Sequence, residues 1–338
     1  MDSLREHGLR IGDLDPGPRC SIADVEGVRV GHVTVVRDEP GVARTGVTAI
    51  VAGATVSEPL RAGVAVLNGA GEMTGSLQVA EWGVLETPVY LTATMAVGRV
   101  YDGAVAAAVT ADPAVGVESV VIPVVAECDD SWLSDPRPVH VVAADAGRAL
   151  EAASDVVEQG GVGAGAGMVA FGFKGGIGSA SRRAGDAMVG VLVLANFGER
   201  RHLRIDGVPV GALLGDVAVA RPRPAGSCIV VVATDAALGS AQLERVARRA
   251  GLGLARTGST AHHGSGEIFL ALSTARGPEE PLDIDAFFAA TVDATEEAVV
   301  SALWSAETTV GREGRVAHAL PHQAVLELLE AHRRIGVR

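Results

Sequence analysis

The chain has 338 residues, of which 48% are hydrophobic, and this composition excludes a disordered protein and supplies a large core. A formal net charge of −13 argues against nucleic acid or an anionic membrane as a partner. The beginning of the chain lacks an apolar run of the signal-peptide type, and no apolar run is long enough for a membrane span. The three cysteines lie far apart without metal-ligand spacing, so we expect reduced thiols and a cytoplasmic protein.

Short strands dominate the beginning of the chain. Residues 10–36 contain β-branched segments broken by glycine, a pattern typical of hairpins, and residues 45–51 form a further strand. A strand over 64–67 runs into a glycine-rich loop that contains Asn68 and Glu72. These two residues are either a turn residue and a helix-start acid, or polar groups of a site.

A predicted helix over 104–111 is followed by a strand-like segment over 120–126. Pro123 confines that strand to an edge or a bulge, because proline has no N–H for the ladder. The strand leads into a loop rich in carboxylates, which is a composition shared by divalent-metal sites and solvated loops. The spacing differs from that of an EF-hand, so we favour a solvated loop. The carboxylates are Glu127, Asp129, Asp130 and Asp135.

A glycine-rich stretch follows a predicted helix over 148–157. Residues 160–168 have the pattern G-x-G-x-G rather than the dinucleotide-binding G-x-G-x-x-G, and no clean strand precedes them, so a nucleotide role is disfavoured. Lys174, the only lysine of the chain, lies in a glycine-flanked turn. Its ammonium group can face either a developing negative charge or solvent, and the sequence leaves both open.

Two polar groups stand at the ends of predicted core strands. The strand over 188–198 contains Asn196 near its end, where a carboxamide serves as an oxyanion donor or as a turn residue. A polar loop over 258–266 enters another strand, and Ser265 and Glu267 share one face of this segment if it is extended. The remaining predicted elements are helices over 241–251, 284–306 and 322–332.

The joint between Gly226 and Ser227 separates a stretch of linker composition (215–226) from the strongest strand signal of the chain (228–233). A turn is the ordinary interpretation of a Gly-Ser pair. The alternative is self-processing, because cleavage before Ser227 would place a hydroxyl and a new α-amine on one residue. Such an amine has a pKa of about 7.7–8.0 and can activate the hydroxyl as a nucleophile.

Several long segments together resemble the DmpA-type aminopeptidases of peptidase family S58, which includes β-peptidyl aminopeptidases and nylon-oligomer hydrolases. The resemblance extends over about residues 10–325. The matching segments are 24–32, 68–75, 123–135, 171–178, 195–198, 264–269 and 317–321.

The resemblance implies an α+β fold, a four-layer αββα sandwich similar to that of N-terminal nucleophile hydrolases but with different strand connectivity. It implies a single domain over 1–338 that cuts itself between Gly226 and Ser227 into a large chain (1–226) and a small chain (227–338). Ser227 then matches the nucleophile of the family. We expect no metal and no organic cofactor, and a homo-oligomer that is a tetramer or larger.

The resemblance also implies roles for other residues. Asn196 matches the oxyanion asparagine, and Ser265 and Glu267 match the pair that orients the amine of the nucleophile. Lys174 matches a lysine that lies near the oxyanion in nylon-oligomer hydrolases. An acidic pocket with Glu127 and Asp129 would favour a cationic amino terminus on the substrate. Asn68 and Glu72 complete the expected substrate-binding residues.

The chain departs from the family pattern in one place that bears on catalysis. The aminopeptidases carry an oxyanion tyrosine in the segment that matches 127–130, and Asp129 takes its place here. A carboxylate donates no hydrogen bond unless it is protonated. Ser301 and Ala70 likewise stand where asparagine is expected.

We conclude from the sequence that the chain is an autoprocessing N-terminal-serine aminopeptidase or amidase, acting on short peptides or amino-acid amides with α- or β-amino termini. One alternative is an amidase of ω-amino oligomers. Another is an uncleaved, non-enzymatic scaffold of the same fold, which the departure at Asp129 favours and the retained site residues oppose. A metal-dependent amidase would need ligands that the spacing does not supply.

Overall fold

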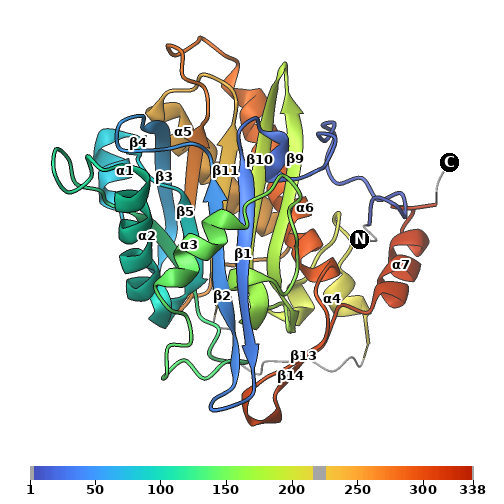
Figure 1. Cartoon of the computed structure of the whole chain (residues 1–338). Coiled ribbons are helices and arrows are strands. Elements are labelled where there is room, and N and C mark those ends of the chain that lie inside the picture. Colours follow the sequence, from blue (N-terminus) through green and yellow to red (C-terminus); the bar gives the residue numbers. More distant parts are fainter. Residues whose placement is uncertain (1–3, 216–225, 337–338) are drawn as a thin grey trace.

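Two β-sheets packed face to face form the centre of the computed structural model, which describes residues 4–215 and 226–336 (Figure 1). The strands of these sheets are β1 (Arg29–Arg37), β2 (Ala43–Val51), β3 (Leu60–Gly69), β4 (Val84–Leu85), β5 (Val89–Ala93), β6 (Val124–Cys128), β9 (Gly176–Ala184), β10 (Ala187–Asn196), β11 (Ser227–Thr234) and β12 (Gly266–Ser273). One sheet has the order β1-β2-β5-β6 and the other the order β4-β3-β12-β11-β10-β9. Two small hairpins pair β7 (Val169–Ala170) with β8 (Phe173–Lys174), and β13 (Thr309–Val310) with β14 (Val316–Ala317).

Helices cover the outer face of each sheet, so the molecule has four layers. The α-helices are α1 (Ser76–Trp82), α2 (Val97–Ala111), α3 (Ala144–Glu151), α4 (Val210–Leu213), α5 (Ser240–Arg256), α6 (Ile284–Trp304) and α7 (His322–Ala331). The pair α2 and α3 packs on the four-stranded sheet, and the pair α5 and α6 packs on the six-stranded sheet (Figure 1). This arrangement confirms the predicted αββα sandwich.

The central strand β11 is buried on both faces, which explains its continuous β-branched sequence. Val230 and Val232 pack against the helical layer of α5 and α6. Ile229 and Val231 pack between the two sheets. The side-chain period of two residues therefore assigns each side chain of this strand to one of two different cores.

Most predicted elements are present, and their differences have physical reasons. The strand β6 lies at the edge of its sheet and begins directly after Pro123, as the missing N–H requires. Helix α3 covers Ala144–Glu151 rather than 148–157. The helix α1 and the strands β5 and β9 were not predicted, and nearly all of the stretch with linker composition lies outside the described residues.

The strand β9 looks like a turn in the sequence because it is rich in glycine. A Cβ atom on Gly178 would lie 1.8 Å from the main-chain oxygen of Ala298 in α6. The glycine is therefore needed for close packing of the helix on the strand, and not for a turn.

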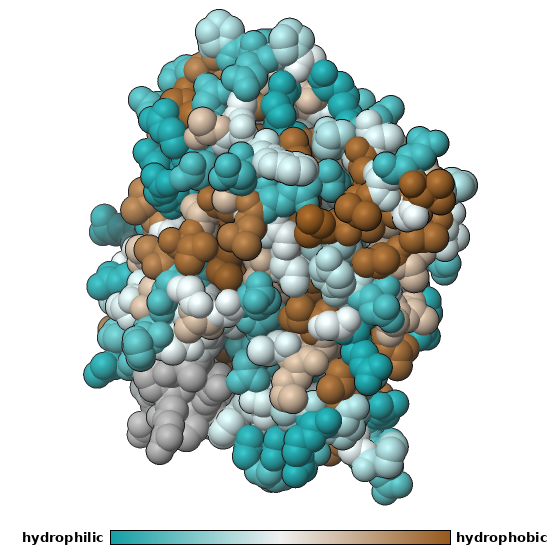
Figure 2. Space-filling model, turned by 90° about the vertical axis from the view of Figure 1, so that its left-hand side faces the viewer, coloured by the Kyte–Doolittle hydropathy of each residue, from teal (hydrophilic) through white to brown (hydrophobic). Residues whose placement is uncertain are grey.

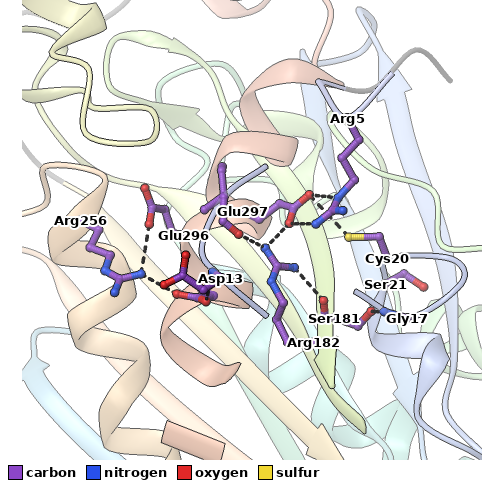
Figure 3. Close-up of polar contacts among 12 residues, drawn as sticks. Arg5, Asp13, Gly17, Cys20, Ser21, Ser181, Arg182, Arg256, Glu296 and Glu297 are labelled. Atoms are coloured by element: carbon purple, nitrogen blue, oxygen red, sulfur yellow. Dashed lines mark hydrogen bonds and ion pairs between the residues drawn. The ribbon is translucent and has the colours of Figure 1, made fainter. Parts of the chain in front are cut away.

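A network of buried ion pairs joins residues near the beginning of the chain to helix α6 (Figure 3). The guanidinium of Arg182 is fully buried and donates to the carboxylate of Glu297, as does that of Arg5. The Cys20 thiol donates to the same carboxylate at 3.5 Å. Burial alone would raise the pKa of Glu297, but the two arginines outweigh it and lower that pKa below its usual value.

Candidate active site

Three strand ends meet at one end of the six-stranded sheet. Asn196 at the end of β10 pairs with Ser227 at the start of β11, and Ser227 pairs with Gly266 at the start of β12. Because β10 is antiparallel and β12 parallel to β11, the end of β10 and the starts of β11 and β12 lie at the same end of the sheet. The structure therefore brings together residues that are far apart in the sequence and that were predicted to form one site.

The hydroxyl of Ser227 is buried and available for chemistry. The residue is 4% exposed, and its Oγ has no hydrogen-bond partner among the residues that the structure describes. It lies next to the thiol of Cys128, which itself donates to the main-chain oxygen of Leu194 at 3.7 Å. Because buried hydroxyl groups are ordinarily hydrogen-bonded, an unpaired one at a strand end points to a function.

The residue before the nucleophile must be glycine for a steric reason. A Cβ atom on Gly226 would lie 2.0 Å from the main-chain oxygen of Asn196. The peptide bond between Gly226 and Ser227 is thus pressed against the backbone of the residue that carries the expected oxyanion donor.

The carboxamide of Asn196 is fixed by main-chain groups on both sides. Its Oδ1 accepts from the N–H of Val169 at 3.0 Å, and its Nδ2 donates to the carbonyl of Asp129 at 2.9 Å. An N–H can only donate and a carbonyl can only accept, so this pair of contacts determines the orientation of the amide. Nδ2 carries a second hydrogen, which can donate to a group bound beside Ser227.

Ser265 and Glu267 form a hydrogen-bonded pair beside the start of β11. The hydroxyl of Ser265 donates to Oε1 of Glu267, whereas Oε2 is buried and has no partner within the described part of the chain. Burial raises the pKa of Glu267, although the hydrogen bond from Ser265 and the nearby His262 oppose the rise. This carboxylate therefore keeps capacity for one more donor.

Glu267 lies on the opposite face of the sheet from the Ser227 hydroxyl. It pairs in register with Cys228, one residue beyond Ser227, and successive side chains of a strand point to opposite faces. Its charge acts on the Cys228 thiol, whose pKa is raised mainly by burial. The hydroxyl and the carboxylate thus flank the start of β11 from two sides.

Asn68 acts on the loop that precedes β12. Its Nδ2 donates to the main-chain oxygens of His262 at 2.9 Å and of Ser265 at 2.6 Å. These contacts hold Ser265 in place, so Asn68 supports the Ser265–Glu267 pair.

Glu127 lies within β6 and not in the solvated loop that was expected to begin there. The residue is 3% exposed, its Oε1 accepts from the main-chain N–H of Glu72 at 3.0 Å, and its Oε2 accepts from the hydroxyl of Thr94. Burial raises the pKa of Glu127, and these two hydrogen bonds oppose the rise. The side chain of Glu72 is exposed, so this residue contributes its main chain.

Asp129 also contributes in a way that its side chain does not suggest. Its carboxylate accepts from the N–H and the hydroxyl of Ser131, each at 2.9 Å, and so closes a turn. Its main-chain oxygen is the acceptor of the Asn196 amide. The expectation of a solvated loop is also wrong for Asp130, which is buried.

Lys174 lies near the strand that ends at Asn196, and it is not in a solvated turn. The residue is fully buried in β8, and its Nζ donates to the main-chain oxygens of Gly165 at 2.9 Å and of Gly175 at 2.7 Å. A Cβ on Gly175 would lie 2.4 Å from the oxygen of Ala195, the neighbour of Asn196. Burial lowers the pKa of Lys174 to about 7.

The sequence interpretation missed three residues that contact the expected site residues: Thr94, Cys128 and Val169. Val169 acts through its main chain and leaves no signal in the side-chain pattern. Thr94 lies within an apolar segment, and only its position opposite Glu127 gives it a role. Across residues 4–215 and 226–336, no three His, Cys, Asp or Glu side chains gather in a way that could hold a metal ion.

The two sheets between helical layers, with a serine hydroxyl at the start of a central strand, define a hydrolase of the N-terminal nucleophile fold class. The sequence model described as peptidase family S58 matches residues 20–317. The chain therefore belongs to peptidase family S58 and is a peptidase.

Curated relatives agree with this assignment. The β-peptidyl aminopeptidase BapA of Sphingosinicella xenopeptidilytica is 40% identical, with 94% of this chain and 88% of the relative covered. The β-peptidyl aminopeptidase BapA of Sphingosinicella microcystinivorans is 38% identical, with 95% and 90% covered.

Solved structures show the same fold over the whole chain. A β-aminopeptidase of Burkholderia sp. aligns with a TM-score of 0.91 at 41% identity, covering 100% of both chains. The L-aminopeptidase D-Ala-esterase/amidase of Ochrobactrum anthropi, described as a variant of the Ntn hydrolase fold, aligns with a TM-score of 0.90 at 36% identity, covering 99% of this chain and 100% of its own. The PH0078 protein of Pyrococcus horikoshii OT3 aligns with a TM-score of 0.92 at 40% identity, covering 98% of this chain and 99% of its own.

Proposed function

We propose that this peptidase is made as a single-domain precursor that cleaves its own Gly226–Ser227 bond, giving chains 1–226 and 227–338. The observation that carries the proposal is the Ser227 hydroxyl, buried, unpaired among the described residues and one bond from a glycine that nothing larger could replace. The hydroxyl oxygen attacks the Gly226 carbonyl, and the Gly–Ser amide becomes an ester. Water then hydrolyses the ester and leaves a Gly226 carboxylate and a free α-amine on Ser227.

The same hydroxyl then serves as the nucleophile for substrates. Ser227 Oγ attacks an amide carbonyl, and the α-amine of Ser227 takes its proton. The oxyanion of the tetrahedral intermediate accepts a hydrogen bond from the second N–H of the Asn196 amide. When the intermediate collapses, the amine returns the proton to the leaving group. Water hydrolyses the resulting acyl ester and regenerates the hydroxyl.

The half-paired carboxylate of Glu267 supports this scheme. The precursor has a neutral peptide nitrogen at Ser227, whereas the mature enzyme has an amine that becomes an ammonium group during each cycle. The unpaired oxygen of Glu267 and the Ser265 hydroxyl give that ammonium group an acceptor. We assign both residues to the orientation of the amine.

Lys174 acts on the oxyanion side in this proposal. Its buried amine holds Gly175 close to the strand that ends at Asn196, and its positive form adds to the potential at the oxyanion. The match of Lys174 with nylon-oligomer hydrolases favours ω-amino oligomers as a second class of substrate. No cofactor is required by either reaction.

The substrate is a short peptide or amino-acid amide with a free amino terminus. The buried carboxylate of Glu127, with Asp129 beside it, supplies negative charge for the ammonium group of such a substrate. Asn68 holds the loop before β12, and the main chain of Glu72 holds the Glu127 carboxylate. The relatives named as β-peptidyl aminopeptidases support a β-amino terminus.

An apolar face supports assembly into a homo-oligomer, a tetramer or larger. Figure 2 shows hydrophobic patches over the side of the molecule that carries α1 and α2. The second half of α2, from 103 to 111, contains no charged residue, so a second copy of this acidic chain meets little repulsion there. The exposed hydrophobic residues of α1, of α2 and of the segments next to α2 are Leu77, Trp82, Met95, Val109, Val117, Val120 and Ile122.

The three cysteines are free thiols, which supports the reducing cytoplasm as the compartment of the enzyme. Within the described ranges, no helix combines the length and the apolar character that a membrane span requires.

A panel of amides tests the proposed function. Purified protein is incubated with matched α-, β- and ω-amino amides and with their N-acetylated forms, and the released amine is measured. We expect release from the free-amino compounds, with β-amino amides preferred, and none from the acetylated forms. Equal hydrolysis of the acetylated forms would contradict recognition of the amino terminus, and Ser227→Ala is the control for turnover by contaminants.

A further inference from the structure

A small cavity lies under the loop that follows β6. Asp130 and His140 contribute to its wall, together with the hydroxyl-bearing residues Thr45 and Ser134. The volume open to the centre of a water molecule is about 10 Å³, close to the minimum that one water requires. The cavity therefore offers several polar groups to an occupant the size of water.

Two of these polar groups are buried and lack a partner. Asp130 is 2% exposed and His140 is 8% exposed. Oδ2 of Asp130 and Nε2 of His140 have no hydrogen-bond partner among residues 4–215 and 226–336. Buried polar atoms without a partner are rare, and two of them on one cavity indicate a bridging molecule.

The partner of the other imidazole nitrogen determines what this molecule must be. Arg37 donates to Nδ1 of His140 at 2.7 Å, because a guanidinium has no acceptor. Nδ1 accepts this bond only from its lone pair, so the ring proton resides on Nε2. Burial and the charge of Arg37 lower the pKa of His140, although the main chains of Asp135 and Val42 oppose the fall. The cavity thus presents an N–H donor from His140 and a carboxylate acceptor from Asp130. A metal cation cannot accept that N–H, whereas a water molecule accepts it and donates to Asp130.

We propose that one buried water bridges His140 Nε2 and Asp130 Oδ2, and that Asp130 is thereby a positioning residue for the oxyanion donor Asn196. The carbonyl that accepts from Asn196 belongs to the peptide unit joining Asp129 to Asp130. The other carbonyl, that of Asp130, accepts from the N–H groups of Leu133 and Ser134 at 3.1 and 3.0 Å. In this proposal a fixed Asp130 side chain adds to these main-chain contacts in holding the peptide unit on which the Asn196 amide rests. The catalytic part of this inference rests on the proposed role of Asn196.

Burial adds a reason for the bridge. It raises the pKa of Asp130 to about 7, because Thr45 and the main chain compensate the loss of water only in part. A carboxylate in this environment gains from a donor on Oδ2. An apolar side chain of the same shape would not pay the cost of burying a charge, so replacing Asp130 by one should not lower the stability of the fold. A loss of turnover without a loss of stability would then identify a positioning role.

The test compares Asp130→Leu, which has nearly the same shape but cannot bind the water, with Asp130→Asn, whose amide oxygen still can. High-resolution crystal structures, thermal unfolding at pH 8, and kcat and KM on a chromogenic amino-acid anilide are measured for both and for the parent. Asp145→Asn is the matched control, because Asp145 is a buried acid in α3 whose carboxylate accepts from the N–H of Val142.

We expect water density within hydrogen-bond distance of both atoms in the parent and none in Asp130→Leu. The Leu variant should unfold at the same or a higher temperature, yet lose at least about 10-fold in kcat with KM changed less than about 3-fold. Asp130→Asn should recover part of kcat, and Asp145→Asn should keep it.

Absence of an ordered water in the parent, or parental kcat in Asp130→Leu, would overturn the inference. A parent that neither cleaves itself nor turns over would contradict the proposed function instead. In that case the crystal structures still decide the inference, through the water density and through the contact of Asn196 Nδ2 with the Asp129 oxygen, which is 2.9 Å in the parent and should lengthen in the Leu variant.

Discussion

Two buried glutamates of this chain differ in how completely they are paired. Glu297 has partners for both carboxylate oxygens, from Arg5 and Arg182, and its pKa is lowered (Figure 3). Among the residues that the structure describes, Glu267 has a partner for one oxygen only, and burial raises its pKa. The paired carboxylate of Glu297 holds the beginning of the chain against α6, whereas the spare oxygen of Glu267 is available to the donor that the proposed reaction supplies, the ammonium group of Ser227. The comparison thus distinguishes a carboxylate that stabilises the fold, Glu297, from one with a proposed role in catalysis, Glu267.

The largest effect is expected from the nucleophile. In Ser227→Ala neither self-cleavage nor turnover can start, because both begin with attack by the hydroxyl. The variant should stay full-length, fold normally and show no hydrolysis of amino amides, as measured by a denaturing gel, circular dichroism and the amide assay. If it still splits at the same bond, another nucleophile is at work, and Cys228 is the nearest.

The two glutamates can be compared directly by the same substitution. Glu297→Gln leaves the buried Arg182 without its counter-charge and should lower the free energy of unfolding by about 3–5 kcal/mol. Glu267→Gln removes a buried charge that has one partner in the described part of the chain, so stability should change little, while turnover should fall steeply. Urea unfolding of both variants on the uncleaved Ser227→Ala background measures stability, and the cleavable background measures turnover. Equal losses of stability would remove the distinction on which the comparison rests.

Asn196→Ala should lower kcat by about 10²–10³-fold, equivalent to about 3 kcal/mol, with little change in KM. The reason is that the free N–H of Nδ2 binds the oxyanion, which exists only along the reaction. Steady-state kinetics on the preferred amide measures both constants. An unchanged kcat would exclude Asn196 from the reaction, and a pure rise in KM would assign it to substrate binding.

A smaller effect is expected from Lys174, in the pH dependence of stability. Burial lowers its pKa from 10.5 to about 7 in the folded chain, so between these pH values the unfolded chain binds a proton that the folded chain does not. Its contribution to the free energy of unfolding should therefore rise with pH across this window. Unfolding of Ser227→Ala at pH 7.5 and 9.5, with and without Lys174→Met, measures it. An identical slope in both would show that the lysine stays charged.

The sequence predicted the helices and strands whose own side chains show a clear hydrophobic pattern. The β-branched run of β11 and the long apolar pattern of α6 are visible without a structure, because each is buried by its own residues. The strand β9 was missed because its glycines are explained by the close approach of α6 at Ala298, more than 100 residues away. Local sequence gives no sign of such a contact.

For the candidate site as well, the sequence predicted which residues take part but not the contacts that hold them. Resemblance identified Ser227 and the residues expected around it, but not how they are held. Asn196 rests on main-chain groups of Val169 and Asp129, and Glu127 on the main chain of Glu72. Main-chain contacts of this kind depend on the packing of the loops, so they cannot be predicted from the pattern of side chains in the sequence. The same holds for the complete burial of Lys174.

The central claim is that the start of β11 is a cleavage site, and one measurement tests it most directly. The purified protein is incubated at neutral pH, separated on a denaturing gel, and the smaller product is sequenced from its amino terminus. The 34.3 kDa chain should give products of about 23 kDa and about 11 kDa, the smaller beginning Ser-Cys-Ile-Val, with activity appearing as the precursor disappears. A full-length chain that remains uncut while it hydrolyses amides would contradict the account.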